Sequence, residues 1–211
     1  MESGVGFLKA SIDLSSERDF LIKEKIISEK KSTTLGEGSI SGVDINRFRP
    51  NSEMRAKIRS ELQISTNAIV FLYVGRLNKD KGISELLDSF LKLKKLSNSE
   101  THLIIVGPDE EAIVANAAEK IAAAKKYIHI LPYCEQPEFY MAASDVLVLP
   151  SYREGFGVVI IEAAAVGITS IGSRIYGISD AIVDNKTGLL FNLADPEDLS
   201  QKMLLLVTDN D

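Results

Sequence analysis

Cysteine, tryptophan and long apolar runs are scarce or absent in this sequence. Cys134 is the only cysteine among 211 residues and tryptophan is missing, so no disulfide can form within the chain. This usage suits a reducing compartment, and we expect a cytoplasmic protein. No apolar run reaches the roughly 18 residues that a spanning helix requires. The first residues also lack the basic and apolar regions of a signal peptide.

Positive charge is also limited. Lysine and arginine number 24 against 30 acidic residues, which gives a formal net charge of −6. A global basic surface for nucleic acid is therefore excluded, and any phosphate site has to be local. Cys134 has no neighbouring cysteine or histidine and the chain has no Asp-x-Asp pair, so we expect no metal site.

From residue 70 onward, short apolar runs alternate with helix-like stretches. The predicted strands are Val70–Gly75, His102–Gly107, Tyr127–Tyr133, Asp145–Ser151, Thr169–Ser173 and Thr187–Phe191. Helices are predicted over 83–95, 110–126, 137–144, 158–167 and 195–206. Strict alternation predicts a parallel sheet, and continuously apolar strands predict that helices cover both of its faces. We therefore predict an α/β fold, a Rossmann-like doubly wound parallel sheet, over residues 46–211, with its ligand at the carboxyl ends of the strands.

The first 45 residues follow a different pattern. A strand over 9–15, a charged helix over 16–30 and a second strand over 31–39 are predicted, followed by a connector. This is too little for a domain, and we expect residues 1–45 to be a remnant of a neighbouring domain together with the connector.

The first candidate site follows the strand Val70–Gly75. Arg76 and Lys81 leave the strand through a polar loop, and the next helix begins near Ile83. Two cations beside a helix N-terminus form a phosphate site, because backbone N–H groups and the helix dipole add to their charge. The alternative is a solvated charged loop, which fits Lys79 and Lys81 better than Arg76.

The second candidate site is the segment 150–167. Gly155, Phe156 and Gly157 open a helix whose free N–H groups can bind an anion, and Glu154 precedes them. Glu162 lies further along this apolar helix, where a carboxylate is costly without a partner. That partner is either a structural ion pair or a ligand hydroxyl or cation.

Several other polar and aromatic residues are expected to be structural. His129 alternates with isoleucines and is expected to be a satisfied strand residue, whereas His102 is expected to be solvated. Asp109 and Glu110 are expected to be helix-start charges. Tyr127, Tyr133 and Tyr140 are expected to contribute to packing.

Taken together, the ordered motifs resemble the family 4 retaining glycosyltransferases of the GT-B fold (group 1 glycosyltransferases). The segments are GSISGVDINRFRP, VFLYVGRLNKDKG, HLIIVGPDEE, YCEQPEFYMAASDVLVLPS, EGFGVVIIEAAAVGITSIGS and KTGLLF, which cover nearly the whole chain. Glu154 and Glu162 match the family's E-x7-E motif, and Arg76 and Lys81 match its basic pair. The chain is similar to the C-terminal, donor-binding domain of these enzymes. Its GEGSISGVD connector is similar to bacterial enzymes of polysaccharide biosynthesis.

The resemblance implies a role for each matched residue. Arg76 and Lys81 would hold the donor diphosphate, Glu154 the transferred sugar and Glu162 the ribose, while residues 131–133 would flank the base. The implied catalytic residues are Arg76, Lys81 and Glu154. The implied donor-binding residues are Gly75, Gly107, Leu131, Pro132, Tyr133, Gly155, Phe156, Gly157, Val158 and Glu162. No cofactor and no essential metal are implied, because the cations and the helix terminus neutralise the leaving diphosphate.

The implied reaction transfers a hexosyl-type sugar from a UDP-sugar, with retention, to a glycan or lipid-linked acceptor. The acceptor would bind through the N-terminal domain, most of which is absent here, so we expect this chain alone to be an inactive fragment. The full-length enzyme could associate with the inner face of the membrane. Two alternatives stay open: a non-catalytic nucleotide-sugar-binding module, and another GT-B enzyme such as a sugar-phosphate-using synthase or an epimerase of nucleotide sugars. The Glu154–Glu162 pair argues against the epimerase.

Overall fold

A six-stranded parallel sheet forms the centre of the molecule. The computed structural model describes residues 10–12, 15–34 and 42–208. The strand order is β5-β4-β3-β6-β7-β8, and every pairing is parallel. The strands are β3 (Ile69–Val74), β4 (Thr101–Val106), β5 (Ile128–Leu131), β6 (Val146–Leu149), β7 (Thr169–Ser173) and β8 (Leu189–Phe191). The predicted Rossmann-like doubly wound sheet is confirmed.

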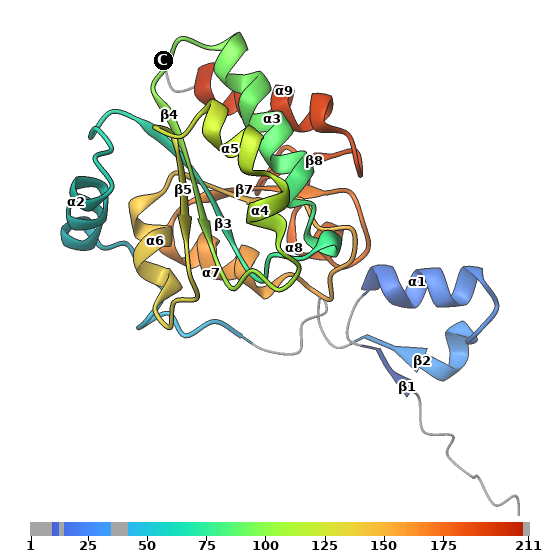
Figure 1. The fold of residues 1–211 in the computed structure, drawn as a ribbon. Helices are drawn as coiled ribbons and strands as arrows, with labels where there is room; N and C mark the ends of the chain where they lie inside the picture. Colours follow the sequence, from blue (N-terminus) through green and yellow to red (C-terminus); the bar gives the residue numbers. More distant parts are fainter. Residues whose placement is uncertain (1–9, 13–14, 35–41, 209–211) are drawn as a thin grey trace, which may run out of the picture.

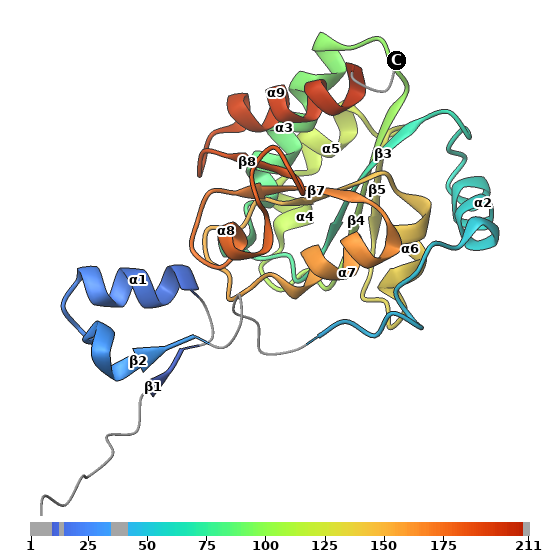
Figure 2. The same ribbon diagram turned by 180° about the vertical axis from the view of Figure 1, so that it is seen from behind.

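Helices cover both faces of the sheet, as Figures 1 and 2 show from opposite sides. One layer holds α3 (Ile83–Leu96), α4 (Ile113–Asn116), α5 (Ala118–Ala123) and α9 (Pro196–Thr208). The other holds α6 (Pro137–Ala143), α7 (Val158–Val166) and α8 (Ile178–Ala181), with α2 (Ser52–Glu61) packed against α6. The residues of β4 and β6 are all buried, which explains why these strands are apolar without alternation.

The helices of the main domain differ from the prediction in three places. The helix predicted over 110–126 is broken into α4 and α5 at Ala117, whose φ and ψ are −101° and 12°. Asp109 caps α4 by accepting hydrogen bonds from the backbone N–H groups of Ile113 and Val114, at 2.7 and 3.0 Å, which confirms its helix-start role. The helices α2 and α8 were not predicted, although Asn51 caps α2 by accepting from the Met54 N–H at 2.9 Å.

The two histidines lie together at the amino ends of β4 and β5. His102 is only 1% exposed, so the expectation that it is solvated is wrong. Its Nδ1 lies 3.0 Å from His129 Nε2, and its Nε2 lies 3.2 Å from Glu100 Oε1. The two rings satisfy each other, which confirms the structural role expected for His129.

The N-terminal residues form a small β–α–β unit beside the main sheet. It consists of β1 (Ala10–Ser11), α1 (Ser15–Lys23), the 3₁₀ turn η1 (Glu29–Lys31) and β2 (Ser32–Thr33), and its two strands pair in parallel. The unit contacts the main domain through Ser16, which donates backbone and hydroxyl hydrogen bonds to Asp180.

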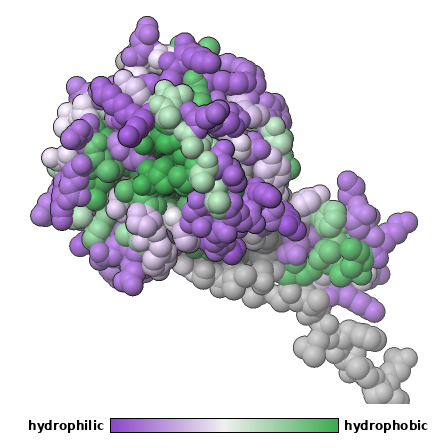
Figure 3. Space-filling model, in the orientation of Figure 1, coloured by the Kyte–Doolittle hydropathy of each residue, from purple (hydrophilic) through white to green (hydrophobic). Residues whose placement is uncertain are grey.

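No residue of α1 is buried, and apolar side chains are visible on the surface of this unit in Figure 3. Its origin as a remnant of an N-terminal domain stays a prediction. Residues 1–9, 13–14 and 35–41, which include parts of both predicted strands and of the connector, lie outside the described residues. Among the residues described, no helix combines the length and apolar composition that crossing a membrane requires.

Candidate functional site: the crevice between β3 and β6

The strand order reverses next to β3. The chain runs from β3 through β4 to β5 on one side, then returns to β6 on the other side of β3. The loops that follow β3 and β6 therefore lie at the switch point of the strand order, and we call this region at the carboxyl ends of the two strands the crevice. In open α/β sheets, ligands bind at such a point. Both candidate segments of the sequence, the one after Val74 and the one after Leu149, begin at this crevice.

The two loops are joined by a salt bridge between predicted site residues. Lys81 Nζ lies 2.5 Å from Glu154 Oε1, and the side chains are only 16% and 18% exposed. Ser151 Oγ donates to the same carboxylate oxygen at 3.0 Å. The backbone N–H of Tyr152 donates to the carbonyl oxygen of Asp80 at 2.8 Å, which ties the loop to the 3₁₀ turn η2 (Lys79–Lys81). The structure thus brings Lys81 and Glu154 into direct contact.

Arg76 lies two residues after the end of β3, with its side chain 63% exposed. Its Nη1 lies 3.4 Å from Glu110 Oε2, a surface ion pair that contributes little energy and that a ligand can displace. The backbone of Arg76 is held in place by the buried Tyr73, whose hydroxyl donates to the Arg76 carbonyl oxygen at 2.8 Å. Burial, and after it the charge of Glu154, raise the pKa of Tyr73, so this hydroxyl stays a donor.

Tyr73 was not singled out in the sequence. The available signal was a hydroxyl in a wholly apolar strand, which has to find a partner when buried.

The glycine-rich loop before α7 depends on a close backbone approach. Gly157 has φ 71° and precedes the first residue of α7. The N–H of Ile160 already donates to the Gly157 carbonyl oxygen at 2.8 Å, whereas the N–H groups of Val158 and Val159 have no hydrogen-bond partner among the described residues and are available to a ligand. A Cβ at Gly177, where φ is 81°, would lie 1.4 Å from the Gly155 carbonyl oxygen. Only glycine therefore fits at Gly177, which the sequence did not reveal as part of the site. Phe156 is partly buried in this loop.

Glu162 lies in α7 and is partly buried. Within residues 15–34 and 42–208 it has no hydrogen bond and no salt bridge, so the structural ion pair considered for it is not formed there. Loss of solvent raises the pKa of Glu162, the charge of Arg47 lowers it, and the charge of Glu138 raises it. A half-buried carboxylate without a partner is the arrangement expected of a ligand-binding group.

A cavity of about 470 Å³ lies at the carboxyl ends of β3, β4 and β5. Its volume is within the range of small-molecule sites, about 300–1,000 Å³. It is lined by Arg47, Val74, Gly75, Arg76, Val106, Gly107, Pro108, Tyr133, Cys134, Glu135 and Pro137. Four predicted site residues therefore meet here: Gly75, Arg76, Gly107 and Tyr133.

Close packing explains the glycine at position 107. A Cβ there would lie 1.8 Å from the Gly75 carbonyl oxygen. Tyr133 is 68% exposed, so the packing role expected for it is wrong. Of the remaining predicted residues, Leu131 ends β5 and is partly buried, and Pro132 is exposed; neither lines this cavity.

Arg47 is a site residue that the sequence analysis missed. Its Nη2 donates to Glu138 Oε2 at 2.9 Å and to the Glu135 carbonyl oxygen at 2.5 Å, which fixes the connector against α6. Its guanidinium lines the cavity and its charge also acts on Glu162. No sequence signal points to it, because Arg47 meets these partners only when a segment about 90 residues away folds against it.

The fold and crevice define an α/β protein with a candidate binding site for a phosphate-containing ligand, and the comparisons identify its family. Residues 54–211 match the family model described as glycosyl transferases group 1. The chain belongs to this family.

The matches with known proteins cover nearly all of this chain but only about half of each relative. The capsular polysaccharide biosynthesis glycosyltransferase CapM of Staphylococcus aureus is 28% identical over 190 residues, which are 90% of this chain and 49% of CapM. A crystal structure of a glycosyltransferase from Rickettsia africae has a TM-score of 0.82 at 23% identity. The match covers 95% of this chain and 53% of the Rickettsia chain. Anabaena HepE in complex with UDP-glucose has a TM-score of 0.80 at 20% identity, covering 96% and 54%. The chain thus spans about half the length of the relatives it matches.

Proposed function

We propose that this chain is the donor-binding half of a retaining glycosyltransferase that uses a UDP-sugar. The observation that carries the proposal is the crevice between β3 and β6, where Arg76, the Lys81–Glu154 pair and the glycine-rich start of α7 lie together. Two cations and a helix N-terminus are the groups that bind a diphosphate in a protein with excess negative charge.

Each part of the donor has a matching group. Tyr133 and the cavity beside Gly107 hold the base, and Glu162 accepts hydrogen bonds from the ribose. Arg76 and Lys81 hold the diphosphate, and Glu154 accepts from the sugar hydroxyls. As the bond to the sugar breaks, negative charge grows on the leaving UDP, and the two cations stabilise it there without a metal ion.

The comparisons favour this donor and a glycan product. HepE has been crystallised with UDP-glucose, and CapM is named for capsular polysaccharide biosynthesis. By analogy, the acceptor is a glycan or a lipid-linked sugar, held through the N-terminal part of the whole enzyme. The β1–α1–β2 unit beside Asp180 is the piece of that part contained in this chain.

Calorimetry in the presence of a chelator tests the proposal. UDP should bind the chain at micromolar to millimolar concentration, and uridine should bind more weakly because it leaves Arg76 and Lys81 unused. Absence of heat with UDP, GDP and ADP at millimolar concentration would rule the proposal out. If UDP bound only when the chelator was left out, the proposal that the donor binds without a metal ion would be contradicted.

A further inference from the structure

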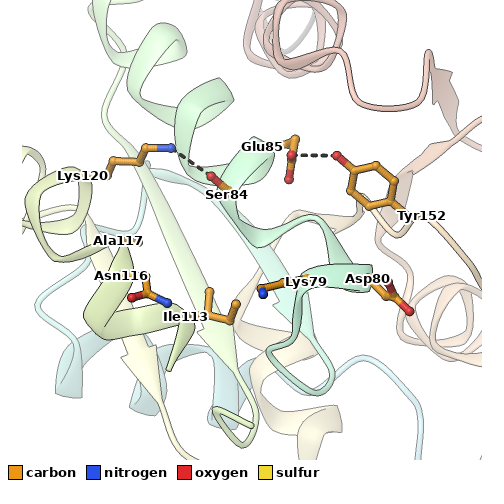
Figure 4. A pocket seen from close by; sticks show the side chains of 9 residues that line it. All are labelled: Lys79, Asp80, Ser84, Glu85, Ile113, Asn116, Ala117, Lys120 and Tyr152. Carbon is orange, nitrogen blue, oxygen red and sulfur yellow. Dashed lines mark hydrogen bonds between the residues drawn. The ribbon is translucent and has the colours of Figure 1, made fainter. Parts of the chain in front are cut away.

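A second cavity, of about 490 Å³, lies beside the crevice on the α3 side of the sheet. Figure 4 shows its lining side chains, which come from η2, α3, α4, α5, the break between α4 and α5, and the loop after β6. They are Lys79, Asp80, Ser84, Glu85, Ile113, Asn116, Ala117, Lys120 and Tyr152. None of them lines the cavity beside Gly75 and Tyr133, so the two cavities are separate.

The charges that line this cavity cancel. Two lysines face two carboxylates, and most of these groups already have partners. Lys120 Nζ lies 2.8 Å from Asp88 Oδ2, and Asp80 Oδ2 lies 2.6 Å from Arg153 Nη2. An anionic ligand would approach the carboxylates as closely as the one cation left over, so the lining favours a neutral ligand.

Both hydrogen-bond donors and hydrogen-bond acceptors remain unused in this lining. The side chains of Lys79 and Asn116 make no hydrogen bond within the described part of the chain, and Figure 4 shows both beside Ile113. The ammonium only donates, whereas the amide donates and accepts. Glu85 keeps one oxygen, because the Tyr152 hydroxyl donates to the other at 2.7 Å. That bond raises the pKa of Tyr152 to about 12, so the ring is held in place with its hydroxyl protonated.

Apolar surface completes the lining. Ile113, Ala117 and the Tyr152 ring offer hydrocarbon faces between the polar groups. Hydroxyl groups both donate and accept, and they alternate with C–H faces on a sugar ring, which is the pattern of this lining. We infer that this cavity binds a neutral saccharide, with Lys79 and Asn116 holding its hydroxyls. This inference goes beyond the donor site of the proposed function.

The cavity is connected to the crevice by two short segments. Lys79 and Asp80 belong to the same 3₁₀ turn as Lys81, and Tyr152 belongs to the same loop as Glu154. A saccharide that restrains Lys79 and Tyr152 therefore restrains the turn and loop that carry the Lys81–Glu154 pair. Any effect of the saccharide on UDP affinity has to equal the effect of UDP on saccharide affinity.

Saturation-transfer NMR on the full chain tests the inference. Glucose, galactose, N-acetylglucosamine and maltose are titrated with and without saturating UDP. At least one should bind, and its signals should persist with UDP. Asn116→Leu should weaken it roughly tenfold, the cost of lost hydrogen bonds, and Lys79→Met should weaken it as well. The matched control is Asn67→Leu, since Asn67 is also exposed but precedes β3, at the amino ends of the strands; this variant should bind the saccharide like the wild type.

Three results would overturn the inference. They are displacement of every saccharide by UDP, wild-type saccharide affinity in both Asn116→Leu and Lys79→Met, and no binding of any of the four saccharides at millimolar concentration. The variants are compared without UDP, so their result is independent of the proposed donor. Loss of UDP binding alone would count against the donor site and leave the saccharide comparison intact.

Discussion

Glu154 and Glu162 lie on the same segment but in opposite electrostatic states. Glu154 is paired with Lys81 and accepts a hydrogen bond from Ser151, whereas Glu162 has no hydrogen-bond or ion-pair partner in the described structure. A ligand at Glu154 has to compete with partners already present. A ligand at Glu162 adds hydrogen bonds without removing any. We therefore expect Glu162 to contribute more to UDP affinity, and Glu154 to distinguish among ligands that carry a sugar.

The largest loss is expected from Lys81→Met. Charge-assisted hydrogen bonds are worth about 1.5–3 kcal/mol, so UDP should bind roughly 10- to 150-fold more weakly. Uridine affinity should change by less than about twofold, because uridine has no phosphate for Lys81 to contact. Calorimetry with both ligands measures this, and the exposed Lys186→Met is the control. Equal losses for UDP and uridine would show that the Lys81–Glu154 pair acts on the fold instead.

Arg76→Ala should follow, with a loss of roughly tenfold for UDP, near the lower end of the range for charge-assisted contacts. The smaller value reflects its exposure of 63%, since solvent weakens the contact. Arg153→Ala is a matched control, because Arg153 is also exposed and pairs with a carboxylate, that of Asp80 in η2. Similar losses in the two variants would show a general effect of charge rather than a specific contact at Arg76.

Glu162→Gln should weaken UDP about 3- to 10-fold, since a neutral acceptor forms weaker hydrogen bonds than a carboxylate. Its melting temperature at neutral pH should not fall. A carboxyl whose pKa is raised by folding stabilises the protein at low pH, and this contribution is lost as the pH rises through the folded pKa. A large melting loss with unchanged UDP affinity per folded molecule would make Glu162 structural.

The pH dependence of UDP binding is a second test of the role of Glu162 in binding. Loss of solvent raises its pKa above the ordinary 4.5, so the carboxylate should become protonated at a higher pH than a free glutamate. UDP affinity should therefore fall as the pH decreases, beginning above 4.5. This decrease should be absent in Glu162→Gln and present in Glu154→Gln. The same profile in both variants would assign the titration to another group.

The smallest effect on UDP is expected from Glu154→Gln. Removing the charge frees Lys81 for the diphosphate, so UDP affinity should stay within about twofold of the wild type. The advantage of UDP-glucose over UDP should decrease, because the sugar hydroxyls lose a charged acceptor. Calorimetry with UDP and UDP-glucose on both glutamate variants decides the comparison. If both variants behave identically, the two glutamates do not divide the donor between them.

The strands of the main domain were predictable because they are buried on both faces and carry little besides apolar residues. The boundaries of the helices were less predictable than the strands. Strong helix formers predicted one helix over 110–126, yet the chain turns at Ala112, where φ is 54°, and breaks at Ala117. Helix propensity differs by less than about 1 kcal/mol per residue among ordinary residues, so packing against α3 decides the outcome.

The candidate site divides in the same way. Arg76, Lys81, Glu154 and Glu162 could be found because each is a charged residue beside a strand end or within an apolar helix. Arg47, Tyr73 and Gly177 could not. Arg47 reaches Glu138 across distant sequence, Tyr73 supports a backbone carbonyl, and Gly177 is required by a neighbouring loop.

The sequence by itself determined the order of strands and helices, and hence the parallel sheet, because apolar periodicity and short-range signals are local properties of the chain. Only the tertiary structure decided the state of the charges. Lys81 pairs with Glu154 and Arg76 with Glu110, whereas Glu162 forms no hydrogen bond or salt bridge with any described residue. The physical reason is that an ion pair depends on distances of a few ångströms between loops far apart in the chain, which are fixed only when β3 and β6 lie side by side.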